Sequence, residues 1–178
     1  MKLATLLLVT ALLLWGCGDK KADNPEKKPT AAGAELPANL FVDKIDGAVS
    51  IVEARKLKPG DKVTVTGKVM GAEQVFVDGR AFLVLGDPAK MTSCDLKPDD
   101  PCRTPWDVCC DDEKDIKEGT LSVQVVDANG KILKTGLKGK SGLKELAFVT
   151  VVGTVSADST ADAMTINAEK ISVSEKAK

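Results

Sequence analysis

Four of the five cysteines in the chain lie in one short stretch, CDLKPDDPCRTPWDVCC, which runs from Cys94 to Cys110. Thiols gathered in this way can form disulfide bonds, bind a thiophilic metal ion or carry out thiol–disulfide exchange. The spacing lacks the C-x2-C pairs of structural zinc sites and a C-x-x-C motif of redox sites, and the chain has no histidine. The pattern therefore favours disulfides, with no metal and no cofactor, and the other two chemistries remain alternatives.

The first 16 residues have the pattern of an export signal. An apolar run from Leu3 to Leu14 follows a lysine, and it is too short for a bilayer-spanning helix, which needs about 20 residues. The run ends in Leu14-Trp15-Gly16-Cys17, which resembles the lipobox of bacterial lipoproteins, although Trp15 stands where a small residue is usual. The resemblance implies cleavage before Cys17 and attachment of palmitate-type acyl chains to Cys17, which would anchor the protein stably in a membrane.

Residues 17–40 are expected to form the lipidated cysteine and a disordered tether. The segment after Cys17 is polar, holds three of the eight prolines and shows no apolar period. In lipoproteins, an Asp directly after the lipidated cysteine often marks inner-membrane retention, but here that position is Gly18. The expected location is therefore the cell envelope, at the periplasmic face of the outer membrane.

An exported cysteine-rich loop is expected to be disulfide-bonded, because the periplasm is oxidising. Residues 87–119 are acidic and poor in apolar side chains, so we expect that burial alone does not order them. Adjacent side chains on an extended backbone point apart, which favours pairing Cys94 and Cys102 one each with Cys109 and Cys110, in either order. Each bridge would contribute about 2–3 kcal/mol of stability, with Trp106 as the one large apolar group available to pack on them.

Apolar residues alternate with polar ones on both sides of this loop, and the alternation predicts five β-strands. In the first strand valines alternate with two threonines and Lys68, which places Lys68 on the polar face. Ser50 and Glu53 form a capping-box pattern, which predicts a short helix that ends near Leu57. The strands are predicted to begin near Lys62, Arg80, Thr120, Phe148 and Met164.

Two of these strands share the pattern V-T-V-x-G-x-V, at Val63–Val69 and at Val149–Val155. A glycine inside a strand allows the sharp coiling that closure of a barrel requires. In the last strand the apolar parity changes, which predicts a β-bulge near Glu169–Lys170. The shared glycine pattern favours two strands of one closed barrel.

Five strands, two of them coiling at a glycine, with a connector at 136–146 that has room for one or two helical turns, resemble an OB-fold barrel. The resemblance covers residues 48–174 and is to the "nucleic-acid-binding OB" group of uncharacterised bacterial proteins. It implies an all-β fold class: a small five-stranded Greek-key barrel in residues 41–178, with a short N-terminal helix. The disulfide-stapled insertion 87–119 would lie between strands 2 and 3. A different Greek-key barrel or a β-sandwich is the alternative.

Composition narrows the possible functions. The chain has 25 Lys and Arg against 26 Asp and Glu, and it lacks histidine, the commonest general base. No paired-carboxylate or nucleophile–base motif stands in a recognisable setting, so we expect that the protein is not an enzyme. These observations favour a membrane-anchored extracytoplasmic lipoprotein with a non-catalytic binding or structural domain.

An OB-like barrel implies a concave binding face on strands 2 and 3 and their flanking loops, for an envelope protein or a polymer. Nucleic-acid or oligosaccharide binding is the alternative, and few aromatic residues and a balanced charge count against nucleic acid. A cysteine-based metal or thiol-redox protein is the second alternative. The candidate ligand-binding residues are Phe76, Arg80, Lys138, Lys140 and Lys144.

Overall fold

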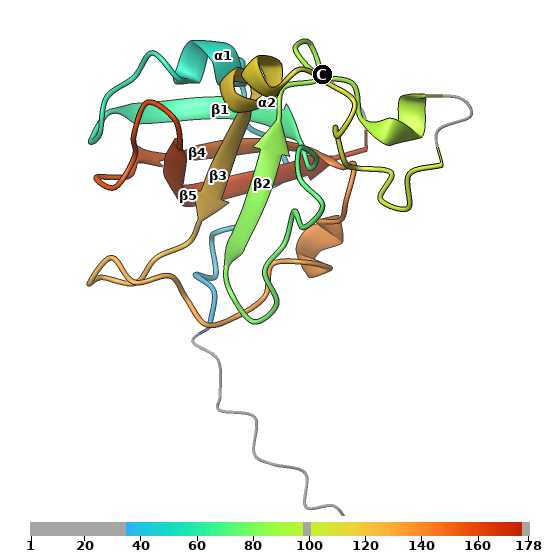
Figure 1. Cartoon of the computed structure of the whole chain (residues 1–178). Coiled ribbons are helices and arrows are strands. Elements are labelled where there is room, and N and C mark those ends of the chain that lie inside the picture. Colours follow the sequence, from blue (N-terminus) through green and yellow to red (C-terminus); the bar gives the residue numbers. More distant parts are fainter. Residues whose placement is uncertain (1–34, 98–100, 176–178) are drawn as a thin grey trace, which may run out of the picture. The chain divides into compact units, whose positions relative to one another are not determined.

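The computed structural model describes residues 35–97 and 101–175 (Figure 1). The export signal, Cys17 and most of the tether lie outside these residues and stay predictions. Within the described residues, no helix combines the length and the apolar character needed to cross a membrane. The helices and strands are α1 (Ile51–Ala54), β1 (Lys62–Lys68), β2 (Phe82–Gly86), α2 (Glu113–Gly119), β3 (Thr120–Gln124), β4 (Phe148–Val155) and β5 (Thr165–Ser174).

The five strands close into one barrel in the order β1-β2-β3-β5-β4, with β4 pairing back to β1. Neighbouring strands are antiparallel, except that β3 and β5 run parallel. β1 pairs with β4 over seven residues but meets β2 only at Lys68 and Gly86. The predicted all-β class and the closed five-stranded barrel are confirmed, and the sandwich alternative is wrong.

The two glycines of the repeated pattern lie at opposite ends of the β1–β4 pair. Gly67 stands across from Val149, and Gly153 stands across from Val63. At Gly153 an added Cβ would lie 2.3 Å from the backbone oxygen of Asn167, so β5 can approach β4 this closely only because that side chain is missing. The glycine of β4 therefore permits the close packing that closes the barrel.

β5 carries one extra residue opposite this glycine. Val152 pairs with Lys170 and Gly153 pairs with Ala168, so Glu169 has no opposite residue on β4. The β-bulge predicted near Glu169–Lys170 is confirmed. It explains why the apolar parity changes at this point of the strand.

Helix α1 begins at the predicted cap, because Ser50 Oγ accepts a hydrogen bond of 3.2 Å from the backbone N–H of Glu53. The α-helix ends at Ala54, three residues before the predicted end. The backbone N–H of Leu57 bonds the oxygen of Ala54, so the chain continues as a tighter turn to the predicted residue. Ile51 is fully buried and joins α1 to the barrel core.

Alternate residues of the strands point into the barrel, as period-two patterns require, and in β5 the alternation shifts by one residue at the bulge. Burying each such side chain stabilises the fold by about 1.5–3 kcal/mol relative to leaving it exposed. The core residues contributed by the strands are Val63, Val65, Leu83, Leu85, Leu121, Val123, Val149, Val151, Val155, Ile166 and Ile171.

The cysteine-rich insertion lies between β2 and β3, as predicted. It contains a 3₁₀ turn at Cys94–Leu96 and helix α2, which was not predicted and which lies over the same end of the barrel as α1 (Figure 1). The expectation that burial does not order this insertion is wrong. Its side chains Met91 and Val108 form a small apolar cluster with Met70, which follows β1, and Trp106 and Ile116 pack against this cluster.

Candidate functional site

A buried lysine fixes the insertion to the barrel. Lys68, on β1, is only 6% exposed, and its Nζ donates to Ser93 Oγ at 2.8 Å and to Asp95 Oδ1 at 3.2 Å. These two acceptors flank Cys94 in the sequence, so the lysine positions this cysteine directly. Lys68 lies on the face of β1 that the alternation indicates, but it is buried there because the insertion covers that end of the strand.

Two segments of the insertion, residues 92–97 and 105–111, are called its arms, and backbone hydrogen bonds join them. The N–H of Cys94 donates to the oxygen of Asp107 at 2.9 Å, and the N–H of Asp95 donates to the oxygen of Pro105 at 2.8 Å. These bonds run between the segment that carries Cys94 and the segment just before Cys109. The arms are therefore held side by side without a covalent bridge.

The side chain of Asp111 also links the two arms through hydrogen bonds. Its carboxylate accepts from the N–H of Thr92 at 2.7 Å and from Lys97 Nζ at 3.0 Å. The hydrogen bond with Asp111 raises the pKa of Lys97, and the nearby thiol groups of Cys110 and Cys94 raise it further. Lys97 therefore places a positive charge beside two of the cysteines.

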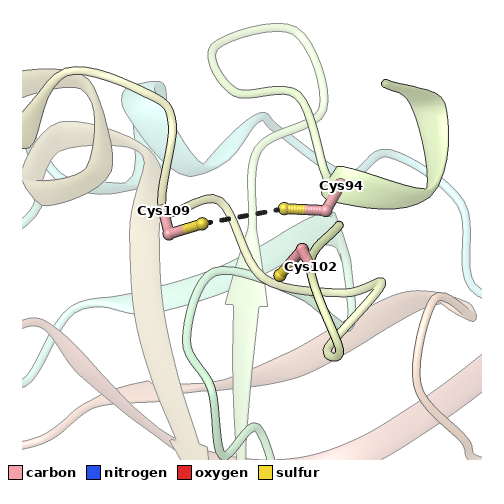
Figure 2. Close-up of side chains that lie close together, drawn as sticks. All are labelled: Cys94, Cys102 and Cys109. Atoms are coloured by element: carbon pink, nitrogen blue, oxygen red, sulfur yellow. Dashed lines mark hydrogen bonds between the residues drawn. The ribbon is translucent and has the colours of Figure 1, made fainter. Parts of the chain in front are cut away.

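Three cysteine side chains converge between the arms (Figure 2). The Sγ atoms of Cys94, Cys102 and Cys109 all lie within 4.8 Å of one another, and those of Cys94 and Cys109 are 3.9 Å apart. A disulfide bond needs a separation of about 2.05 Å. Among the described residues no two sulfurs lie at that distance, so the structure lacks the predicted disulfide staple.

Cys109 and Cys110 do not have the expected extended backbone. They lie in a turn, which the bond from the N–H of Asp111 to the oxygen of Val108 closes at 2.9 Å. As a result their sulfurs are 4.0 Å apart, on the same side of the chain. The prediction that these two side chains point apart was wrong, because it assumed a strand where the chain turns.

The thiols differ in acidity. Hydrogen bonding with the side chain and then with the backbone of Thr104 lowers the pKa of Cys102, whose Sγ lies 3.3 Å from Thr104 Oγ1. A hydrogen bond with Cys94 lowers the pKa of Cys109, but the Cys110 thiol, burial and the remaining neighbours together raise it above its ordinary value. Cys102 is therefore the thiol that loses its proton most readily of these two.

A surface cleft of about 400 Å³ lies where the insertion meets the barrel. It is lined by Glu73–Asp78, which follows β1, and by Trp106, Lys138 and Glu145. The indole N–H of Trp106 donates to the backbone oxygen of Glu73 at 2.9 Å, so the tryptophan is fixed as one wall. The sequence predicts that Trp106 packs on disulfides, and no local signal in the sequence indicates that it lines a cleft.

The structure brings together two of the five predicted ligand-binding residues. Phe76 and Lys138 line the cleft, whereas Arg80, Lys140 and Lys144 are exposed and do not line it. The lysines do not form a free basic patch. Lys138 is paired with Glu145, and Lys144 lies 3.5 Å from a carboxylate oxygen of Glu175.

No protein-family description, no curated protein and no solved structure matches this chain.

Proposed function

We propose that the chain is a membrane-anchored lipoprotein of the cell envelope, and that its OB-like barrel is a non-catalytic binding module. The strand order supports the OB-like assignment, because β1 lies between β2 and β4 and, among the paired strands of the described barrel, only β3 and β5 run parallel. The observation that carries the binding function is the cleft beside Trp106, where two aromatic side chains and several carboxylates converge on one hollow of the surface.

The cleft favours an oligosaccharide over a nucleic acid. Its charged side chains are Glu73, Asp78 and Glu145 against Lys138, and that lysine is already paired with Glu145. A cleft with this excess of carboxylates repels a phosphate backbone, which needs cations. Aromatic side chains offer apolar faces for sugar rings to stack on, and carboxylates accept hydrogen bonds from hydroxyl groups. We therefore propose that the ligand is an envelope oligosaccharide without net negative charge.

Trp106 makes the binding test direct. The chain has two tryptophans and no tyrosine, and the other tryptophan, Trp15, lies in the export signal. In the mature chain from residue 17, with Cys17→Ser to prevent lipidation, all tryptophan emission therefore comes from Trp106 in the wall of the cleft. We expect neutral oligosaccharides from envelope polymers to change this emission saturably, and single-stranded DNA or heparin to leave it unchanged at low salt.

Two variants locate the binding. Phe76→Ala should weaken oligosaccharide binding, because it removes an aromatic wall of the cleft. Lys140→Ala is the matched control, since Lys140 is exposed on the connector and does not line the cleft. Equal loss in both variants, or saturable binding of DNA in place of sugars, would overturn the proposed ligand class.

The anchor has a separate test. Metabolic labelling with a palmitate analogue should label the full chain, and Cys17→Ala should abolish both the label and the membrane association. A Cys17→Ala protein that stays with the outer-membrane fraction would contradict the lipoprotein assignment.

A further inference from the structure

We propose that Cys94, Cys102 and Cys109, together with the adjacent Cys110, form a binding site for a thiophilic metal ion, with Zn²⁺ as the expected occupant. This site is independent of what the cleft binds. It replaces the disulfides that the sequence favoured.

The distances between the sulfur atoms match those of thiolates bound to one zinc ion, and they are too long for disulfide bonds. Zinc–sulfur bonds are about 2.3 Å long, so two sulfurs at corners of a zinc tetrahedron lie about 3.8 Å apart. The pairs Cys94–Cys109 and Cys109–Cys110 have sulfur separations of 3.9 and 4.0 Å. Cys102 completes a group of three sulfurs within 4.8 Å, which converge on one point between the arms (Figure 2).

Hydrogen bonds and apolar packing hold these sulfurs in place without a disulfide bond. Cys94 is 5% exposed, and Lys68 binds the residues on both sides of it. The backbone bonds between the arms and the apolar core around Val108 fix the approach to Cys109. Cys109 itself is exposed, which leaves the ion a path from solvent. A site held by packing and outer hydrogen bonds is the arrangement that metal binding requires.

The surroundings suit a cluster of thiolates. Thr104 Oγ1 lies 3.3 Å from the sulfur of Cys102 and can donate to it once its proton is lost. Lys97 supplies a positive charge that offsets the excess negative charge of several thiolates around one divalent ion. Outer partners of this kind orient metal ligands and tune their basicity.

The donor set selects the class of cation. All the converging ligands are sulfur, which suits zinc or Cu(I) and not Ca²⁺ or Mg²⁺, which take oxygen ligands. The nearby carboxylate of Asp111 is occupied by Thr92 and Lys97. Zinc takes four ligands, and three converge here. The fourth position is open to a water molecule, or to Cys110 after rotation of its side chain, since the Cys110 sulfur lies 4.0 Å from that of Cys109 but outside the group of three. As each sulfur bonds the ion, its thiol proton passes to solvent, and no electron is exchanged.

The test uses the reduced mature chain with Cys17→Ser, titrated with Co²⁺ as a coloured substitute for zinc and then with Zn²⁺. We expect one equivalent of cobalt to give the visible absorption of tetrahedral thiolate coordination, and one equivalent of zinc to remove it. Cys94→Ser and Cys109→Ser should each weaken binding by at least about a hundredfold, since loss of even an outer partner costs about 10–100-fold. Asp112→Asn, in the same loop, is the matched control and should bind as the parent does.

A second measurement needs no variant. Zinc should protect the loop thiols of the parent protein from alkylation by iodoacetamide, and a chelator should restore their reactivity. A cysteine variant that fails to fold is recognised by its circular dichroism, and the alkylation result then decides. Absence of both the cobalt absorption and the zinc protection would overturn the proposal. Unchanged binding in folded Cys94→Ser and Cys109→Ser proteins would also overturn it, as would a selective loss in Asp112→Asn.

Discussion

Replacing Lys68 with methionine should destabilise the protein strongly, although the alternation in β1 places this lysine on the polar face of the strand. Methionine has a similar length and keeps the packing of the side-chain stem, but it removes the ammonium group. Ser93 and Asp95 then lose the donor that they share at 2.8 and 3.2 Å. Breaking a fully buried ion pair costs about 3–5 kcal/mol. The Asp95 side chain is 27% exposed and keeps some hydration, so we expect about 2–3 kcal/mol.

Urea unfolding of the mature chain measures this change. Far-UV circular dichroism follows the barrel, and the emission of Trp106 follows the insertion. With a urea dependence of about 1.5–2 kcal/mol per molar, a loss of about 2–3 kcal/mol should lower the midpoint by about 1–2 M. The emission transition should fall at least as far as the dichroism transition, because Lys68 ties the insertion to β1.

Two comparisons isolate the buried pair. Lys62→Met lies on the same strand, where the lysine side chain is 79% exposed and 3.6 Å from Glu169, and it should change stability by less than about 1 kcal/mol. In the double variant Lys68→Met, Asp95→Asn, no charge is left unpaired, so part of the loss should be recovered. If Lys68→Met unfolds at the same urea concentration as Lys62→Met, the role assigned to the buried ammonium is refuted.

Two further substitutions test the closure of the barrel. Gly153→Ala should cost about 3 kcal/mol or more, because its Cβ would lie 2.3 Å from the backbone oxygen of Asn167. Gly67→Ala should cost less, about 1–2 kcal/mol, because its Cβ would lie 2.9 Å from the end of the Ile51 side chain and 3.1 Å from the nearest backbone atom, the oxygen of Gly86. The urea midpoints give the order, and a reversed order would contradict the close approach of β5 to β4. Arg55→Met should cost about 1–3 kcal/mol, because the guanidinium donates twice, at 2.9 and 3.2 Å, to the backbone oxygen of Thr120. Full recovery of the urea midpoint by Arg55→Lys would show that this forked geometry is unimportant.

The barrel was predictable because its causes are local. Period-two alternation marks the core face of each strand, and the glycine pattern marks the places where two strands coil. The β-bulge followed from the changed apolar parity at Glu169 and Lys170 alone. The capping box likewise fixed the start of α1 at Ser50.

The site was harder to predict because its contacts join distant parts of the chain. Nothing near Lys68 in the sequence indicates that Ser93 and Asp95 will cover it. The turn at Cys109 and Cys110 depends on how the insertion folds back, and that turn decides how far apart the two sulfurs lie. Cysteine spacing alone therefore suggested disulfides, whereas the sulfur positions favour a metal ion.

Native mass spectrometry tests most directly whether the cysteine loop is a metal site. The mature chain with Cys17→Ser is exported to the periplasm behind a cleavable secretory signal and isolated without reductant or chelator. We predict the mass of the fully reduced chain plus one zinc ion, less the thiol protons that the ion displaces, and loss of the zinc on acidification. A metal-free chain four hydrogens lighter than the reduced form would show two disulfides in the loop and would contradict the metal site.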